Sequence, residues 1–358
     1  MTITEAATDT GSVETFLGQV ASDAATAFHA ATVVLGDKLG LYKALADGGP
    51  ATPAELAART GYDARYLEEW GNAQIAAGYC AYDPATGRLE LTPAQATVLA
   101  DDTSPAFAAS LFSLGAVLFK DEERMNRAAV RNGTGVAWHD HHHDLFHGTE
   151  RLFKPGYVSN LVASWIPALD GVADKLTAGA KVADIGCGHG ASTIVMAEAF
   201  PNSTFVGFDY HPGSIDVARQ RAADAGVADR VAFEVSSAAD FSGKDFALVC
   251  VFDALHDMGD PVAAASHIRS ALAPDGTFLI VEPMAGESVL ENCNPIGKLF
   301  YSAGMFLCVA HAKAEGGTLE LGPQVPEATW RGLLGEAGFT RFRRATETPF
   351  NRVFEARR

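Results

Sequence analysis

A glycine-rich segment is the first place in the sequence where residue types and spacing could do chemistry. Gly186, Gly188 and Gly190 follow directly on an apolar run. Asp209 stands nineteen residues after Gly190, at the end of the next apolar run. Glycines let the backbone turn tightly and approach a ligand closely, because no Cβ stands in the way. A carboxylate at the end of the second strand can accept both hydroxyl groups of a ribose, so the pattern predicts a ligand that contains adenosine.

The spacing of the glycines separates two classes of adenosine ligand. Dinucleotide-binding folds use G-x-G-x-x-G and place a pyrophosphate at the helix N-terminus. Here the spacing is G-x-G-x-G, and Asp184 lies within the preceding strand. An acid at that point repels pyrophosphate but suits a cation. S-adenosylmethionine (SAM) carries a sulfonium and an ammonium group and no phosphate. The alternative is a glycine turn in an unrelated α/β protein with an Asp nearby by chance.

His256 could supply acid–base chemistry at the same edge of the expected sheet. It lies just past the fourth expected strand, on the side where open α/β sheets bind ligands. A histidine with a near-neutral pKa is suited to take the proton of a phenol or alcohol. The alternative is a histidine that only caps a loop. Glu282 ends the fifth strand at the same edge, where its other possible role is to accept backbone amides ahead of Pro283.

The elements that must position these residues alternate between strands and helices from residue 180 onward. Apolar runs of this length between amphipathic helices indicate an open, mostly parallel sheet covered on both faces. A short link around Pro349 suits a hairpin, so we expect the last strand to be antiparallel to the rest. The expected fold class is α/β, a Rossmann-like doubly wound seven-stranded sheet. Its strands are residues 181–186, 204–209, 231–235, 246–252, 277–282, 339–346 and 351–356.

The N-terminal part of the chain has the pattern of a small helical module. Apolar residues recur at helical spacing over residues 13–46, where Gly36 and Gly40 are possible breaks. Thr52 and Glu55 are spaced as a capping box at the start of the next helix. A second helix and two short strands follow, at residues 79–82 and 88–91. This order predicts a winged helix, and the alternative is any small helical module with a hairpin.

Together these motifs resemble the class I SAM-dependent methyltransferases. Residues 182–190 with Asp209 are similar to the nucleotide-binding half of that family. The sequence F-D-A-L-H-D-M at 252–258 looks like the L-H-D segment of small-molecule O-methyltransferases of the plant caffeate and hydroxyindole type. A-L-A-P-D-G at 271–276 and E-A-G-F at 336–339 match two later motifs of the same group.

The resemblance also implies a role for each domain. The winged helix and residues 138–157 resemble a bacterial branch of these enzymes, in which such a domain serves dimerisation and caps the substrate pocket. We therefore expect a homodimer and a small-molecule substrate that enters between the domains. The expected segments are a disordered N-terminus (1–12), a helical winged-helix dimerisation and substrate-capping domain (13–150) and a SAM-binding methyltransferase domain (151–358).

The resemblance assigns residue roles as well. His256 would be the general base, Glu282 would orient its ring, and the methyl group would move from SAM by in-line displacement, which leaves S-adenosylhomocysteine. Many relatives carry an acid after the third strand, where this chain has S-S-A-A-D at 236–240, so Ser237 and Asp240 both remain candidates for the adenine edge. The cofactor-binding residues so implied are Asp184, Gly186, Gly188, Gly190, Asp209, Tyr210, Ser237, Ala238 and Phe252.

Aromatic, methionine and histidine side chains are candidates for the substrate pocket. They suggest a flat or apolar substrate, and ordinary core packing is the alternative for most of them. The run W-H-D-H-H-H-D-L-F-H at 138–147 could ligate a metal, but three consecutive histidines cannot all face one ion on a regular backbone. We expect no metal and a polar interdomain linker. Gln324 and Glu327 are both candidates for a second acid near the base. The expected substrate-binding residues are His139, Phe146, Phe153, Tyr157, Met258, Asn294 and Tyr301.

Composition narrows the class of partner. The 358 residues include 27 basic and 44 acidic side chains, a formal charge of −17, which argues against a nucleic-acid or anionic membrane partner. The five cysteines lack a C-x-x-C pair and are expected to be reduced, and neither a signal peptide nor a membrane span is expected. These features predict a cytoplasmic protein. We expect the late arginines to form a solvated edge: Arg341, Arg343, Arg344, Arg352, Arg357 and Arg358.

Three other functions stay open at this point. Methylation of nitrogen or carbon is possible on the same scaffold, as is a SAM-binding enzyme that no longer transfers methyl groups. A metabolite-sensing winged-helix transcription regulator is the third. Glu68 and Glu69 argue against a DNA-binding regulator, because they lie on the helix that would read DNA and would repel phosphate.

Overall fold

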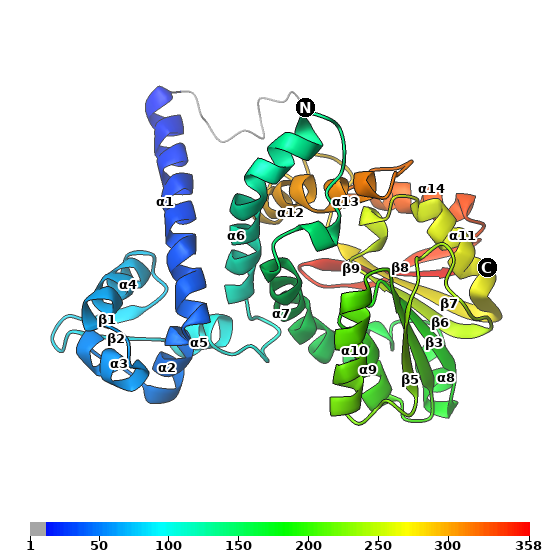
Figure 1. Ribbon diagram of the computed structural model, residues 1–358, viewed down its shortest axis with the longest axis horizontal. Helices are drawn as coiled ribbons and strands as arrows, with labels where there is room; N and C mark the ends of the chain where they lie inside the picture. The colour runs from blue at the N-terminus through cyan, green and yellow to red at the C-terminus, as the bar shows by residue number, and fades with distance from the viewer. Residues whose placement is uncertain (1–11) are drawn as a thin grey trace. The chain divides into compact units, whose positions relative to one another are not determined.

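The computed structural model describes residues 12–358, and the chain divides into two compact units (Figure 1). The first unit contains the described residues up to Lys120 together with Asp144–Pro155. The second contains Asp121–His143 and Gly156–Arg358. Of the segment 1–12 predicted to be disordered, residues 1–11 lie outside the described residues. Ser12 caps the first helix, because its hydroxyl accepts the backbone N–H of Thr15 at 3.1 Å.

The first unit is mostly helical. The sequence allowed a break at Gly36 or Gly40, and only Gly40 separates two helices, with a left-handed φ of 69°. Gly36 stays inside the first helix, where a Cβ would lie 2.7 Å from Nε1 of Trp70, so this glycine permits close packing. The helices of this part of the chain are α1 (Val13–Lys38), α2 (Leu41–Gly48), α3 (Pro53–Thr60), α4 (Ala64–Ala76), α5 (Pro93–Leu99), α6 (Ala109–Arg124) and α7 (Asp144–Asn160).

Helices α3 and α4 and a two-stranded sheet form the predicted winged helix. The capping box is present: the Thr52 hydroxyl accepts the Glu55 N–H at 3.2 Å, and the Glu55 carboxylate accepts the Thr52 N–H at 2.8 Å. Leu56, Trp70 and Leu89 pack into one buried cluster of this unit. The strands are shorter than predicted and pair antiparallel, β1 at Ala81–Asp83 with β2 at Arg88–Glu90.

The second unit is built on a seven-stranded sheet with the order β5-β4-β3-β6-β7-β9-β8. The neighbours from β5 to β7 are parallel, and β9 is antiparallel to both β7 and β8, which confirms the predicted antiparallel last strand. The chain reverses its direction of winding between β3 and β6, where open sheets bind ligands. The strands are β3 (Lys181–Ile185), β4 (Thr204–Asp209), β5 (Val231–Val235), β6 (Phe246–Phe252), β7 (Leu272–Pro283), β8 (Arg341–Glu347) and β9 (Asn351–Arg357).

Helices cover both faces of this sheet, as a doubly wound fold requires (Figure 1). One buried cluster includes Met196 and Ala218, and the other includes Ile268 and Trp330. The predicted Rossmann-like α/β fold is therefore confirmed. The helices are α8 (Val172–Ala178), α9 (Ala191–Ala199), α10 (Pro212–Asp224), α11 (Pro261–Ala271), α12 (Pro295–Phe306), α13 (Cys308–Ala314) and α14 (Glu327–Glu336).

Three predictions about this unit were wrong in detail. Strand β8 spans Arg341–Glu347 rather than residues 339–346. Strand β7 begins at Leu272 rather than at residue 277, because Leu272 already pairs with Phe246 ahead of a shift in register. Arg352 does not belong to a solvated edge. It is fully buried, because β9 lies inside the sheet between β7 and β8.

Two further predictions concern the thiols and the membrane. All five cysteines are free, as predicted, and all but Cys293 are buried. Over residues 12–358, no helix combines the length and the apolar composition that a bilayer crossing would require.

Candidate functional site

The glycine loop lies between β3 and α9, at the point where the sheet reverses its winding. Gly186, Gly188 and Gly190 have φ values of 71°, 52° and 79°, a region that side chains with a Cβ rarely adopt. A Cβ on Gly190 would lie 2.6 Å from the ring of Phe233. The loop therefore needs glycine both for its backbone conformation and for its packing against β5.

Asp184 lies under this loop and is almost completely buried. Its Oδ2 accepts hydrogen bonds from the hydroxyls of Ser192 and Thr193, both at 2.6 Å. Its Oδ1 is buried and has no hydrogen-bond partner among the described residues. Burial raises the pKa of Asp184 to about 6, although the two hydroxyls act in the opposite direction. The ionised carboxylate is thus a costly buried charge with one oxygen still available.

Asp209 ends β4 beside the loop, where the sequence placed it. Its Oδ2 accepts the N–H of Gly188 and its Oδ1 accepts the N–H of His211, each at 2.9 Å. Burial raises the pKa of Asp209, and these two backbone donors partly offset that effect. The carboxylate is therefore held rigidly against the glycine loop. Each of its oxygens keeps a second lone pair for a ligand.

The other residues predicted to bind the cofactor lie on neighbouring strand ends. Tyr210 stacks on His311, with ring centroids 5.4 Å apart. Phe252 ends β6 and packs against Tyr157 at 5.3 Å, which joins a predicted cofactor residue to a predicted substrate residue. Ser237 donates its hydroxyl to Asp240 at 2.6 Å, in the loop after β5.

The two candidates for the adenine edge are thus engaged with each other. Oδ1 of Asp240 also accepts the backbone N–H of Ser237, at 3.2 Å. Ala238, between them, packs against the core cluster beneath the loop. The loop is organised by Asp240, and Ser237 and Ala238 remain predictions for adenine contact.

His256 and Glu282 form a buried pair at the same edge of the sheet. His256 lies in a short 3-10 helix, Leu255–Asp257, directly after β6, and Glu282 lies near the end of the parallel neighbour β7. The His256 Nδ1 and Glu282 Oε2 atoms are 2.8 Å apart, and both side chains are nearly inaccessible to solvent. The sequence placed both residues at this edge, and the structure brings them into contact.

The electrostatic surroundings of His256 favour its charged form. Burial alone would lower the pKa of His256, but the Glu282 carboxylate overcomes this effect and raises that pKa well above its usual range. The other ring nitrogen, Nε2, lies 3.3 Å from Sγ of Cys308. Burial raises the pKa of the Cys308 thiol. In its neutral form, an imidazole with this geometry can accept a proton at Nε2 and hold the resulting charge against Glu282.

Three residues around this pair were not anticipated as part of the site. Cys308 begins α13 and contacts His256, and no sequence signal distinguishes it from a core cysteine. Trp138 donates its Nε1–H to Oδ2 of Asp257 at 3.0 Å. Arg352 pairs in register with Glu282 across the β7–β9 ladder and donates to the carbonyls of Pro283 and Val325. The only signal for Arg352 was an arginine inside an apolar strand.

The residues predicted to bind substrate are spread over both units. In the second unit, the ring of His139 is stacked parallel to that of His211, with centroids 5.8 Å apart. Met258 packs against the core cluster below β6. Phe146 and Phe153 belong to the part of α7 that lies in the first unit, so the structure does not place them relative to His256.

Asn294 and Tyr301 have local roles in the structure. The Asn294 side chain caps α12 by accepting the N–H of Gly297 at 2.9 Å. Tyr301 is exposed, and its hydroxyl accepts a hydrogen bond from Asn292 at 3.2 Å. Substrate contact by these two residues stays a prediction.

The two candidates for a second acid also have other partners. Gln324 donates to the carbonyl of Met284 at 2.9 Å, just beyond the end of β7. Glu327 pairs with Arg331 and Arg344 on the exposed side of α14. Gln324 is therefore the one that lies next to the strand carrying Glu282.

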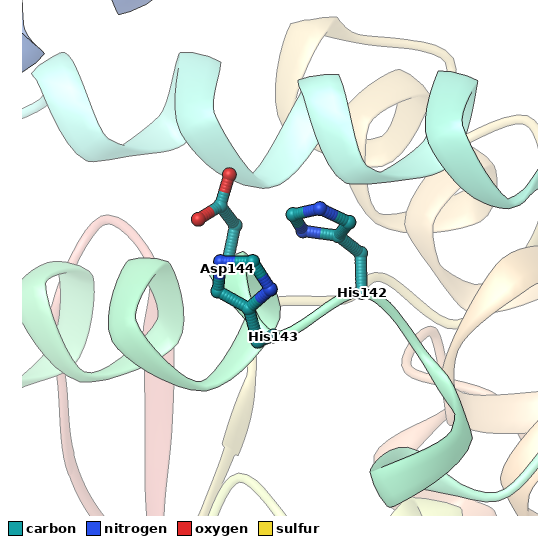
Figure 2. A group of neighbouring side chains, drawn as sticks. All are labelled: His142, His143 and Asp144. Carbon is teal, nitrogen blue, oxygen red and sulfur yellow. The ribbon is translucent and has the colours of Figure 1, made fainter.

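The histidine-rich segment 138–147 contains a group of possible metal ligands. Figure 2 shows His142, His143 and Asp144, three consecutive residues whose side chains gather at the start of α7. The Asp144 carboxylate accepts hydrogen bonds from the ammonium groups of Lys38 and Lys120, at 2.8 and 2.6 Å. These cations hold the pKa of Asp144 far below its usual range. They also repel any metal ion that this carboxylate would bind.

Two regions of the chain match known protein families. Residues 176–332 match the model of a methyltransferase domain, and residues 27–101 match that of an Rv2258c-like winged HTH domain. The chain thus carries a methyltransferase domain after a winged-helix domain. These matches confirm the resemblance to methyltransferases that was inferred from the glycine loop, Asp209 and the L-H-D segment.

Curated relatives of this methyltransferase domain are similar over part of their length. The chain is 35% identical over 132 residues to the 27-O-demethylrifamycin SV methyltransferase of Amycolatopsis mediterranei, which covers 34% of the chain and 48% of that protein. It is 34% identical over 106 residues to the trans-aconitate 2-methyltransferase of Variovorax paradoxus, over 39% of that protein. A match to an uncharacterised protein of Synechococcus covers 24% of that protein. The chain spans about half or less of the length of these relatives.

Solved structures are similar over nearly the whole chain. Human N-acetylserotonin methyltransferase in complex with SAM has a TM-score of 0.71 at 18% identity, and 96% of this chain and 97% of that one are covered. PigF with S-adenosylhomocysteine (SAH) has a TM-score of 0.72 at 18% identity, and the match covers 97% of this chain and 99% of that one. At these identities, the likeness shows a shared fold.

Proposed function

We propose that the protein is a SAM-dependent methyltransferase that methylates a hydroxyl oxygen of a small molecule. The observation that carries the proposal is the buried His256–Glu282 pair, 2.8 Å apart, at the same sheet edge as the glycine loop and Asp209. A proton acceptor beside a nucleotide loop suits a transfer in which the acceptor loses a proton. The matched methyltransferase domain supports the same reaction class.

The loop residues fit SAM as the cofactor. Gly190 leaves no room for a Cβ, and the buried Oδ1 of Asp184 has no hydrogen-bond partner within residues 12–358, so negative charge is available beneath the loop. Asp209 would hold the ribose hydroxyls with its remaining lone pairs. Bound SAM supplies a methyl group already activated on a sulfonium, and the product is SAH. Among known relatives of this fold, solved structures contain SAM or SAH.

His256 would act as the general base at Nε2. Its Nδ1 is fixed by Glu282, so the ring presents Nε2 on the opposite side, where Cys308 lies in this structure. When the acceptor hydroxyl releases its proton to Nε2, the ring becomes a cation and Glu282 stabilises it. Glu282 is thus a positioning residue that also favours the charged product of the proton transfer.

Oxygen is the favoured acceptor, and nitrogen is the second candidate. The relatives include a ubiquinone biosynthesis O-methyltransferase, 29% identical over 54% of its length, and the rifamycin enzyme described above. A riboflavin-derivative N,N-dimethyltransferase shares the fold, with a TM-score of 0.57 at 22% identity. An acceptor hydroxyl needs a base during transfer, whereas a neutral amine can attack first and lose its proton afterwards. A buried base therefore favours oxygen.

We also propose that the protein is a homodimer formed through α1. This helix has exposed apolar side chains along most of its length, a pattern that suits a partner helix. They are Val13, Phe16, Leu17, Val20, Phe28 and Leu35. A second copy of the chain would present the same exposed apolar side chains of α1.

We expect sedimentation velocity to give a dimer for the native protein and a monomer for Phe16→Glu/Phe28→Glu. Phe350→Glu, which changes an exposed aromatic residue of the second unit, should remain dimeric. A native monomer would refute the proposal.

The experiment that tests the proposed reaction has two stages. Calorimetry with SAM, SAH and NADH first identifies the cofactor, and we expect binding of the two sulfur ligands only. A screen of phenols, alcohols and amines with SAM then measures SAH production by the native protein and by His256→Ala.

The histidine variant separates binding from chemistry. Loss of a general base typically slows a reaction by 10²–10⁴-fold, so we expect a loss of about that size with SAM binding retained. His267→Ala is the matched control, because His267 lies on α11, hydrogen-bonds the carbonyl of Phe241 and should not affect transfer. Undiminished turnover in His256→Ala would remove His256 from the base role. Binding of NADH alone would refute the cofactor assignment.

A further inference from the structure

We infer that His256, Asp257 and Cys308 form a binding site for a thiophilic divalent cation, best matched by Zn²⁺, that would switch off the base. One ligand atom of each residue lies within 4.8 Å of the other two, and all three side chains are buried. Binding of the ion is independent of the proposed function, but its inhibitory consequence rests on it.

The spacing of His256 and Cys308 is close to that of two ligands in a tetrahedral zinc site. With a Zn–S bond of about 2.3 Å and a Zn–N bond of about 2.05 Å, the two ligand atoms would be about 3.6 Å apart at the tetrahedral angle. The His256 Nε2 and Cys308 Sγ atoms are 3.3 Å apart. An adjustment of about 0.3 Å therefore suffices, which small side-chain rotations can supply.

Both the histidine and the aspartate are held by outer partners, as ligands of metal sites commonly are. Nδ1 of His256 is bound to Glu282, which leaves Nε2 as the ligand atom. Oδ2 of Asp257 accepts the Trp138 Nε1–H, which fixes the orientation of that carboxylate. These two donors are thus preorganised by their outer partners.

The backbone elements that carry the donors are joined to each other. The N–H of Gly259, just after the 3-10 helix Leu255–Asp257, is bound by the Glu315 carboxylate at 2.7 Å, at the end of α13. The Gly259 carbonyl accepts the N–H of Thr318 at 2.9 Å. One turn along α13, His311 is also buried, and its Nδ1 has no hydrogen-bond partner in the described part of the chain. A second imidazole thus lies on the helix that carries Cys308.

The charge of the cluster suits a divalent ion. A thiolate and a carboxylate supply two negative charges, and a neutral imidazole is the third ligand. Among the ion pairs of the described chain, no lysine or arginine pairs with Asp257, in contrast to Asp144 with its two lysines. Sulfur and imidazole ligands select Zn²⁺ over Mg²⁺ or Ca²⁺. A bound ion would occupy Nε2 of His256, the atom that must take the proton.

Cobalt binding tests the site without any methyl acceptor. Metal-free protein titrated with Co²⁺ should develop a thiolate-to-cobalt absorption at one equivalent, and Zn²⁺ should remove it. Cys308→Ser should lose this absorption, whereas Cys293→Ser, which changes the exposed cysteine, should retain it. Glu282→Gln should weaken binding by about 10–100-fold, because it alters only the outer partner of His256. No sulfur-dependent band, or a band that disappears with Cys293, would overturn the inference.

A second arm measures the consequence for catalysis. Once a methyl acceptor is known, Zn²⁺ should inhibit transfer by the native protein, and half-inhibition of Cys308→Ser should need about 100-fold more Zn²⁺. Mg²⁺ should not inhibit either protein. Cobalt binding at Cys308 without any methyl transfer would refute the proposed function and keep the metal site. Methyl transfer that Zn²⁺ inhibits equally in both proteins would overturn the metal site as a regulator.

Discussion

Replacement of Asp184 by Asn should make the ligand-free protein more stable at neutral pH. The Asp184 carboxyl has a pKa of about 6 in the folded protein, against 3.8 when unperturbed, and the cause is burial. This difference of about 2 pKa units corresponds to about 3 kcal/mol, because one unit is 1.36 kcal/mol. Asn keeps the shape of the side chain, and its amide oxygen can accept the hydroxyls of Ser192 and Thr193 as Oδ2 does. The variant therefore removes a buried charge without removing its hydrogen bonds.

The sign of the pH dependence follows from the raised pKa. Between about pH 4 and pH 6 the folded state holds a proton that the unfolded state has lost. The contribution of Asp184 to the free energy of unfolding is thus most favourable below pH 4, falls by about 3 kcal/mol as pH rises through 6, and is level above. The native protein should lose this amount relative to Asp184→Asn over that window.

Urea unfolding at pH 4.5, 5.5, 6.5 and 7.5 measures this difference. Asp216→Asn is the matched control, because Asp216 is exposed on α10 and its replacement should not change the pH dependence. SAM should stabilise the native protein more than Asp184→Asn, since its positive groups offset the buried carboxylate. Parallel stability curves for the native protein and Asp184→Asn would refute the reasoning. Equal stabilisation of both by SAM would show that this charge does not serve the cofactor.

Three further predictions test other parts of the site. Asp209→Ala should weaken SAM and SAH binding by about 10²–10⁴-fold in calorimetry, because two charge-assisted hydrogen bonds of about 1.5–3 kcal/mol each are lost. Unaltered affinity would exclude a role of Asp209 in binding the ribose. Gly190→Ala should lower the free energy of unfolding by about 1–3 kcal/mol, since φ is 79° and the Cβ would meet Phe233. The control Gly18→Ala, in exposed α1, should raise the free energy of unfolding by about 0.5–1 kcal/mol. A Gly190→Ala variant of unchanged stability would contradict the packing. Trp138→Phe should cost about 1–3 kcal/mol in urea unfolding, because a buried oxygen of Asp257 loses its donor, and an unchanged midpoint would mean that water replaces the indole.

Local sequence signals accounted for much of the fold. The Thr52–Glu55 capping box was predictable because both partners lie within four residues and their hydrogen bonds need no tertiary context. The strands β4, β5 and β6 begin and end at the predicted residues, since each is a short apolar run bounded by polar residues. The glycine loop and Asp209 were predictable for a similar reason. Their spacing reflects one strand–helix–strand unit.

Contacts between distant segments were not predictable in the same way. Gly36 carried a signal for a helix break, but its purpose depends on Trp70, which lies on another helix. Cys308 reaches His256 only because α13 packs on the turn after β6. Nothing in the residues around Cys308 indicates that neighbour. The resemblance supplied the type of the base and its acid, whereas the residue opposite Nε2 comes from the fold of this chain.

The antiparallel last strand brings the C-terminal hairpin next to the proposed base and its acid. Because β9 runs against β7, Arg352 pairs in register with Glu282 at the end of the strand that supports the base. Glu282 Oε1 and Arg352 Nη1 are both buried without hydrogen-bond partners among the described residues, and their opposite charges attract each other. Arg352 also binds the carbonyls of Pro283 and Val325, so it ties the backbone next to Glu282 to the segment that precedes α14. The position of the carboxylate that orients His256 therefore depends on a strand more than sixty residues further along the chain.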